Sequence, residues 1–286
     1  MNILSKTWLQ AWSTLPDLEF CLHRGKCNIK IVDTIMERYR DGKVPIEKFE
    51  LSRRSSYDPH KVLPPIPIDN CLDIAFQNGV SSKDQTVYLK VLKIRDSEGM
   101  WEIDAPNLVS FEYTGKQIPE FKIARQLENS KIYLYRLGNI NADWFCKLRK
   151  FLSKSTGASW SQVSIRFKEC TEIKMEHLQQ HYRVGATTQV DVLEVNVLFQ
   201  LMEWSSFVDA LLWSCLPKRL NLQPRLNLFA VFSDRLMYMK NSRIRPWHSQ
   251  LKETKSFDEN NQLLQLGSEQ LTESVLPSWG SERRGG

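Results

Sequence analysis

The sequence contains no apolar run long enough to cross a membrane, which takes roughly 18 or more consecutive apolar residues. Its first residues, MNILSKTWLQAW, also lack the uninterrupted apolar segment and the small-residue cleavage site of a secretory signal. Charged residues make up 25% of the chain, and the mean hydropathy is −0.40. From these absences we expect a soluble protein of the cytoplasm, the nucleus or both.

The motifs of common catalytic and nucleotide-binding sites are missing as well. Thr114-Gly115-Lys116 has neither the earlier glycine of a phosphate-binding loop nor a hydroxyl residue after its lysine. The GxSxG motif around a nucleophilic serine does not occur. His177 and His181 are four residues apart, but the glutamate beside His177 is on the wrong side for a zinc-protease motif. We therefore predict no catalytic residues and no enzyme activity.

Cysteine and histidine also fail to form a ligand set. The six cysteines are scattered along the chain, which is typical of free thiols and not of a disulfide framework. Cys21, His23 and Cys27 lie close together, yet a structural zinc site needs a fourth ligand and usually a closer pair. The sequence thus predicts no metal and no cofactor.

What recurs along the chain is a short apolar frame: a large apolar residue, two residues, a second apolar residue, one residue, and a third. The copies are Ile46-Phe49-Leu51, Leu89-Leu92-Ile94, Leu108-Phe111-Tyr113, Ile118-Phe121-Ile123, Ile132-Tyr135-Leu137, Trp160-Val163-Ile165, Val190-Leu193-Val195 and, more weakly, Pro217-Leu220-Leu222. Most of them follow one another at or near the roughly 20 to 29 residue period of leucine-rich repeats. The Ile118 copy follows its predecessor too closely, and a long gap separates the first two copies.

One such unit cannot bury its own apolar face, because the last two apolar residues lie on one side of a short strand. Stacked units can, because each strand pairs with the next and the inward side chains form one core. We therefore predict an α/β fold: a leucine-rich-repeat solenoid with parallel strands on its concave face and helices on its convex face. The strands through Leu92, Phe111, Tyr135, Val163 and Leu193 should be neighbours in that order. An ordinary α/β domain with similarly spaced strands is the alternative.

Apolar residues at helical spacing predict helices over residues 3–12, 28–39, 141–155 and 206–214, and in the segment IDNCLDIAFQNG. Gly42 fits the end of the second helix, while Ser206 and Asp209 have the spacing of a capping box at the start of the last one. From about residue 241 the apolar periodicity is lost. The composition of this tail predicts disorder, with at most a short helix over residues 262–271.

Several segments resemble a large plant family, the F-box proteins with leucine-rich repeats, in particular those of the FBD type. ILSKTWLQAWSTLP is similar to the end of an F-box, and IDNCLDIAFQNGV is similar to the helix that precedes the repeats. IDAPNLVSFEYTG, SFVDALLWSC and PKRLNLQ resemble the repeats themselves, and the first of these is the most specific part. The resemblance runs from residue 3 to about residue 249.

The resemblance implies a noncatalytic, substrate-recruiting subunit of an SCF-type ubiquitin ligase. Its F-box would grip the Skp-family linker of a cullin-based ligase, with Leu4 and Trp8 as the linker-binding residues of this chain. Its repeats would hold a protein target for ubiquitination. Because the chain begins inside the last part of an F-box, the alternative is a repeat protein or decoy that binds targets without recruiting a ligase.

Together, the frame and the resemblance predict four regions. Residues 1–16 are the last helix of an F-box, and residues 17–87 are a region of helices and strands that leads into the repeats. Residues 88–240 hold the irregular plant-type repeats, and residues 241–286 form a mostly disordered tail.

Alternation along the predicted strands identifies the residues of a concave, target-binding surface. They are Lys93, Ser110, Glu112, Lys122, Arg136, Ser164, Glu194 and Asn196. The alternative is that these residues are solvated strand positions without a partner.

A nucleic-acid target is the third reading of the function. The predicted helix over residues 141–155 carries a run of bases: Lys147, Arg149, Lys150 and Lys154. However, a net charge of +6 is modest for this length and falls short of the dense basic stripe of a dedicated nucleic-acid binder. The sequence therefore disfavours nucleic acid and membrane as partners.

Overall fold

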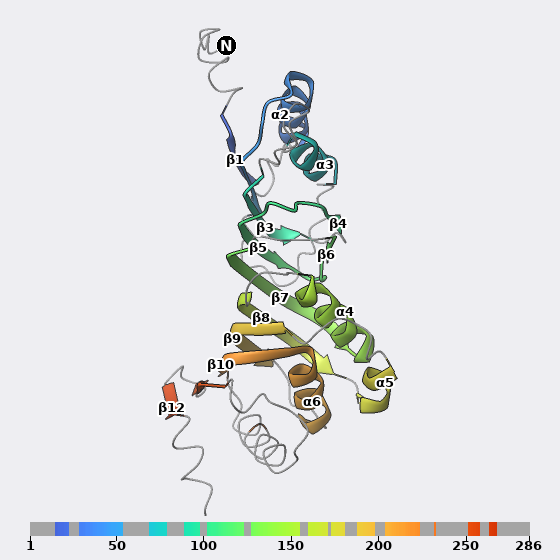
Figure 1. Cartoon of the computed structure of the whole chain (residues 1–286), viewed down its shortest axis with the longest axis vertical. Coiled ribbons are helices and arrows are strands. Elements are labelled where there is room, and N and C mark those ends of the chain that lie inside the picture. Colours follow the sequence, from blue (N-terminus) through green and yellow to red (C-terminus); the bar gives the residue numbers. More distant parts are fainter. Residues whose placement is uncertain are drawn as a thin grey trace, which may run out of the picture.

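The computed structural model describes residues 15–22, 29–53, 69–78, 89–97, 102–122, 127–154, 160–170, 173–180, 188–197, 204–223, 232, 251–257 and 263–267. These segments form an elongated molecule in which the strands are stacked along the long axis (Figure 1). The predicted helix over residues 3–12 and its residues Leu4 and Trp8 lie outside the described part of the chain.

The described strands form two sheets. The main sheet contains β1 (Asp17–Leu22), β2 (Lys48–Arg53), β3 (Val91–Ser97), β5 (Ser110–Gly115), β7 (Asn129–Ile140), β8 (Trp160–Cys170), β9 (Thr188–Val197), β10 (Cys215–Gln223), β11 (Glu253–Phe257) and β12 (Leu263–Gly267). Their order in the sheet is their order in the chain. Nine of these strands run parallel, and β12 pairs with β11 in the antiparallel sense. The short strands β4 (Glu102–Ile103) and β6 (Glu120–Phe121) form a separate parallel pair.

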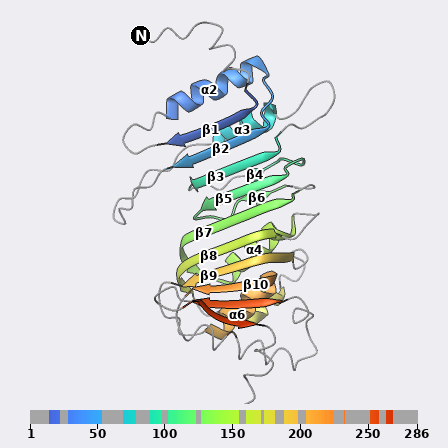
Figure 2. The ribbon, with the colours of Figure 1, turned by 90° about the vertical axis from the view of Figure 1, so that its left-hand side faces the viewer.

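The described helices lie on one side of the main sheet (Figure 1). They are α2 (Ile29–Gly42), α3 (Asp69–Asn78), α4 (Ala142–Ser153), α5 (Met175–Gln180) and α6 (Trp204–Ser214). None of them is long and apolar enough to cross a membrane. Figure 2 shows the opposite side of the sheet, which no described helix covers. We call this side the open face; its residues include Glu50, Lys93, Glu112, Lys131, Tyr133, Ser164, Glu194 and Asn221.

The predicted α/β class is confirmed, and the predicted strands are neighbours in the expected order. Within the sheet, Leu92 pairs with Phe111, Val163 pairs with Leu193, and Leu193 pairs with Leu220. All of these side chains are buried on the helix side of the sheet. The apolar frame therefore sets the register, because a slip of one residue would turn every one of these side chains to the open face.

Two copies of the frame behave differently from the prediction. The copy at Ile118 does not enter the main sheet, because Phe121 belongs to β6 and β5 pairs directly with β7. For the copy at Ile132, the sequence prediction chose the wrong positions as the buried ones. Ile132 and Leu134 are its buried residues, while Tyr135 is half-buried and stacks on the exposed Tyr133.

The end of α2 also differs from the sequence prediction. The helix includes Gly42, and the left-handed residue that terminates it is Lys43, with φ of 50°. The Val44 N–H donates to the Tyr39 carbonyl at 3.1 Å and the Lys43 N–H donates to the Arg40 carbonyl at 3.2 Å, which is the Schellman pattern. The chain turns one residue later than predicted because this turn packs Val44 against the core.

Helix α6 begins earlier than its predicted capping box. Its first residue is Trp204, so Ser206 lies inside the first turn and does not occupy the N-cap position. The helix is apolar on nearly all sides and is buried from Phe207 onward. An all-round apolar helix is typical of a core position, where packing outweighs capping.

Helix α4 matches its prediction, and its contacts explain why it forms there. Asn141 is the N-cap residue, and its side-chain oxygen accepts from the Trp144 N–H at 3.0 Å. At the other end, Trp160 Nε1 donates to the Leu152 carbonyl at 3.1 Å. The Trp160 ring packs against Phe151, with 4.9 Å between ring centroids, and so fixes α4 to the start of β8.

Besides the two-residue strand β4, three strands of the main sheet lie where the sequence predicted none. Strand β1 was missed, although Leu18, Phe20 and Leu22 alternate along it. In the tail, β11 occupies residues 253–257 and β12 occupies residues 263–267. Strand β12 therefore takes the place of the short helix that was expected over residues 262–271. These three strands are short, and each is stabilised by pairing with a neighbouring strand. A local apolar pattern does not predict such a pairing.

Candidate recognition surface

The open face is built from the strand positions that alternate with the core. Lys93, Glu112 and Lys131 occupy successive positions across β3, β5 and β7. The next row runs through Thr114, Tyr133, Ser164, Glu194 and Asn221. Because parallel strands lie about 4.8 Å apart, each row sets side chains from distant parts of the sequence beside one another.

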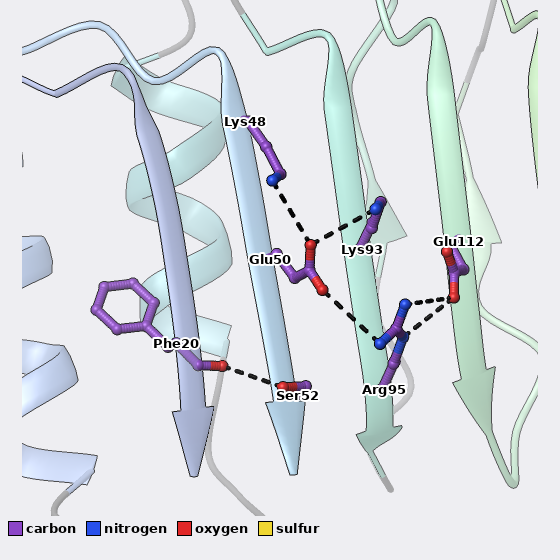
Figure 3. A network of polar contacts seen from close by, with 7 residues as sticks. All are labelled: Phe20, Lys48, Glu50, Ser52, Lys93, Arg95 and Glu112. Carbon is purple, nitrogen blue, oxygen red and sulfur yellow. Dashed lines mark hydrogen bonds and ion pairs between the residues drawn. The ribbon is translucent and has the colours of Figure 1, made fainter.

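A network of charges covers the part of this face formed by β2, β3 and β5 (Figure 3). Glu50 is only 7% exposed and lies between three cations. The distances are 3.7 Å to Lys48, 3.6 Å to Lys93 and 3.8 Å to Arg95.

Arg95 also binds Glu112, with 2.9 Å between Nη2 and Oε1 and a second contact from Nε at 3.0 Å. A guanidinium that offers two N–H groups to a carboxylate is held in a defined orientation. The network contains three cations and two carboxylates, so each carboxylate is already engaged with a cation within the chain.

Polar side chains on β8, β9 and β10 are bonded to one another in the same way. The Ser164 hydroxyl donates to Glu194 Oε2 at 2.7 Å, and Asn221 Nδ2 donates to Glu194 Oε1 at 3.4 Å. Asn196 Nδ2 donates to Gln223 Oε1 at 2.6 Å. Such cross-strand bonds fix the side chains before any partner arrives, which lowers the entropy cost of binding.

Six of the predicted surface residues share this face: Lys93, Ser110, Glu112, Ser164, Glu194 and Asn196. Arg136 lies in β7, outside the residues whose side chains the structure describes. The alternation rule therefore gathers most of the predicted set onto one surface.

Lys122 does not belong to that surface. It follows β6 on the helix side of the main sheet and forms ion pairs with Glu102 at 3.6 Å and Asp104 at 3.4 Å. The hydrogen bond with Asp104 and the negative charges of both carboxylates raise the pKa of Lys122. The prediction failed here because it treated the Ile118 copy of the frame as a strand of the main sheet.

Sequence reasoning missed Glu50, Arg95, Tyr133 and Lys131 as surface residues. Alternation from Phe49 and Ile94 would have identified the first two. Alternation counted from Ile132 would have identified Tyr133 and Lys131. The sequence prediction instead took Tyr135 as a buried position, so it missed both residues.

The bases of α4 divide between two environments. Lys147, Lys150 and Lys154 are exposed and line a hollow on the helix side, which Ile118 and Phe121 also line. Arg149 is instead buried, so it does not share the exposed surface of the other three bases. Its guanidinium donates to the Trp213 carbonyl at 3.0 Å and lies 4.2 Å from the centre of the Trp213 ring.

The described residues hold no group of three or more histidine, cysteine, aspartate or glutamate side chains that could bind a metal ion. Cys71 and Cys215 are buried, and burial raises the pKa of each thiol to about 12. For Cys71, the neighbouring carboxylate of Asp33 adds to this effect. Neither thiol therefore ionises near neutral pH, which makes a nucleophilic role for them unfavourable.

The fold defines an α/β protein with a largely parallel sheet and one open, polar face. The chain matches no family model, no curated protein and no solved structure.

Proposed function

We propose that this chain is a noncatalytic recognition protein of the F-box and leucine-rich-repeat class, and that its open face binds a protein target. In this proposal the main sheet is a leucine-rich-repeat solenoid, with the open face as its concave side. The observation that carries the proposal is the order of the main sheet, in which the strands follow one another as they do in the chain. The buried residues of neighbouring apolar frames are paired across adjacent strands. Stacking of this kind presents a long wall of side chains to a partner.

The second support is the chemistry of the open face. Its charged and polar side chains are bonded to one another across strands, so the surface is ordered without a ligand. A surface of this kind suits specific binding better than chemical reaction, because its carboxylates are engaged in ion pairs and hydrogen bonds.

The proposed role in a ubiquitin ligase is tested with a purified Skp-family linker. In the leading form of the proposal, the linker co-elutes with the chain, and a Leu4→Ala, Trp8→Ala double variant loses it. If the linker does not bind, the ligase role fails and the alternative applies: a recognition protein or decoy that holds targets without delivering them.

Target binding by the open face is tested by affinity capture from plant extract with two charge-reversed variants. The first carries Lys93→Glu and Glu194→Lys on the open face, and the second carries Lys147→Glu and Glu120→Lys on the helix side. Both keep the net charge of the chain. The proposal expects a captured protein that the first variant loses and the second retains, and it is wrong if both variants capture that protein as the unmodified chain does.

A further inference from the structure

The middle of the open face carries a stacked pair of tyrosine rings, of which Tyr133 is exposed and Tyr135 is half-buried. Tyr133 is 36% exposed and stacks on Tyr135, with 6.0 Å between ring centroids and 23° between ring planes. Within the described residues, the other exposed large apolar side chains are Leu15 and Ile31, near the N-terminal end of the sheet. Tyrosine is enriched among the residues that dominate binding energies, because it offers a large contact area at a low entropy cost.

A β-bulge lies at this pair. Leu134 pairs with Ile165 and Leu137 pairs with Phe167, so two residues of β7, Tyr135 and Arg136, stand opposite the single residue Arg166. Strict alternation after Leu134 would place position 136 on the covered side of the sheet. The extra residue resets the register, and bulges that do this often occur where a side chain is re-aimed for function.

Two cations flank the tyrosines. Lys131 precedes Tyr133 by two positions on the same face of β7, and Arg166 stands opposite the bulge on β8. Within the described part of the chain, neither has an ion pair. The nearest carboxylates on this face are engaged elsewhere: Glu112 binds Arg95, and Glu194 accepts from Ser164 and Asn221.

The spacing of these cations indicates the shape of a matching ligand. Lys131 pairs with Gln162, so Arg166 lies four residues further along the neighbouring strand. With a rise of about 3.3 Å per residue and about 4.8 Å between strands, the two Cα atoms are roughly 14 Å apart. Two acidic residues four apart in an extended peptide span about 13 Å, and the residue midway between them falls over the tyrosines.

We propose that Lys131, Tyr133, Tyr135 and Arg166 form the anchor site for an extended acidic segment of the target, with two carboxylates flanking an apolar or aromatic residue. We call these four residues the tyrosine patch. The inference rests on the proposed function, because it takes the open face as the binding surface, and it adds the chemistry of the partner. The cations bind the carboxylates, and the tyrosine rings bury the middle residue.

The test is fluorescence anisotropy with a labelled synthetic peptide, Ser-Glu-Ala-Phe-Ala-Glu-Ser, and the full chain at about 0.15 M salt. We expect binding that falls by about tenfold or more in Tyr133→Ala and in the Lys131→Glu, Arg166→Glu double variant. The matched control is Arg219→Glu, an exposed arginine in the same register row as Lys131 but three strands away. At that distance the charge is largely screened, so its binding should change less than about twofold.

Two further peptides test the geometry. A peptide with lysine in place of both glutamates should not bind, and one with the two glutamates adjacent should bind more weakly than the original. Circular dichroism melting establishes that the variants are folded, which is expected because the substituted side chains are exposed or half-buried.

The inference is overturned if both patch variants bind the peptide as tightly as the unmodified chain. It is also overturned if a single-stranded oligonucleotide binds the patch more tightly than the peptide, with a steep dependence on salt. If Tyr133→Ala keeps a captured target that the Lys93→Glu, Glu194→Lys variant loses, the tyrosine patch is wrong but the proposed function stands. If neither variant loses the target, both fail.

Discussion

Lys43 occupies a backbone conformation that suits glycine. Its φ of 50° lies in the left-handed region, which costs an L-residue roughly 1–2 kcal/mol. Glycine would remove this cost, but it would also make the unfolded chain more flexible, which lowers the free energy of unfolding by roughly 0.4–1 kcal/mol. We therefore expect Lys43→Gly to raise the free energy of unfolding by about 0.5 kcal/mol or more, as measured by urea titration. The control is Lys43→Ala, which keeps the Cβ; equal stabilisation by both changes would contradict the explanation.

The buried thiol of Cys215 makes stability sensitive to alkaline pH. Its pKa is raised to about 12 from an ordinary value of 9.0, because burial disfavours the thiolate. Below pH 9 both folded and unfolded states hold the proton, so the thiol has no effect. Above pH 9 the unfolded chain loses the proton while the folded chain keeps it. Stability therefore falls by up to about 1.4 kcal/mol per pH unit from this group.

The measurement for Cys215 is the free energy of unfolding between pH 8 and pH 10. Between pH 9 and pH 10, the free energy of unfolding should fall by about 1 kcal/mol less in Cys215→Ala than in the unmodified chain. This difference in slope does not depend on the stability that the smaller side chain loses at pH 8. Cys21→Ala, which changes an exposed cysteine, is the control and should keep the slope of the unmodified chain. Parallel curves for all three proteins would show that the Cys215 thiol does not contribute.

At the scale of the element, Arg149 joins two helices. It projects from α4 and donates to the carbonyl of Trp213, in the last turn of α6, where the helix dipole favours a cation. Arg149→Ala should lower the free energy of unfolding by about 3 kcal/mol, because it removes a charged hydrogen bond and a cation–π contact from a buried site. Lys147→Ala, on the exposed side of α4, should change stability by less than about 0.5 kcal/mol. Similar losses in both variants would refute this role.

The elements also show what a sequence can and cannot predict here. Frames such as Leu92-Ile94 and Val163-Ile165 predicted strands and their order, because a half-buried strand leaves a local apolar pattern. The six open-face residues followed from the same alternation. The tyrosine patch did not, because the bulge shifts the register of β7 at Tyr135. Strand β1 is stabilised by pairing with β2 about thirty residues away, a contact that no local pattern contains.

At the scale of the whole molecule, each strand of the main sheet pairs only with its neighbours, so stability should vary along the stack. The longest strands are β7, β8 and β9, with 12, 11 and 10 residues, whereas β1 and β2 have 6 each. Longer strands form more ladder hydrogen bonds and bury more apolar surface. We expect native-state hydrogen exchange to be slowest in β7, β8 and β9 and faster in β1 and β2.

A core substitution tests whether this coupling is local. Val163 is fully buried in β8, and Val163→Ala should cost about 2 kcal/mol through lost burial and the cavity it leaves. Because coupling passes between adjacent strands, exchange should accelerate in β7, β8 and β9 while β1 and β2 keep their rates. Lys131→Ala, an exposed change on β7, is the control and should leave all of these rates unchanged. An equal acceleration in every strand would mean that the sheet unfolds as one cooperative unit, contrary to nearest-neighbour stacking.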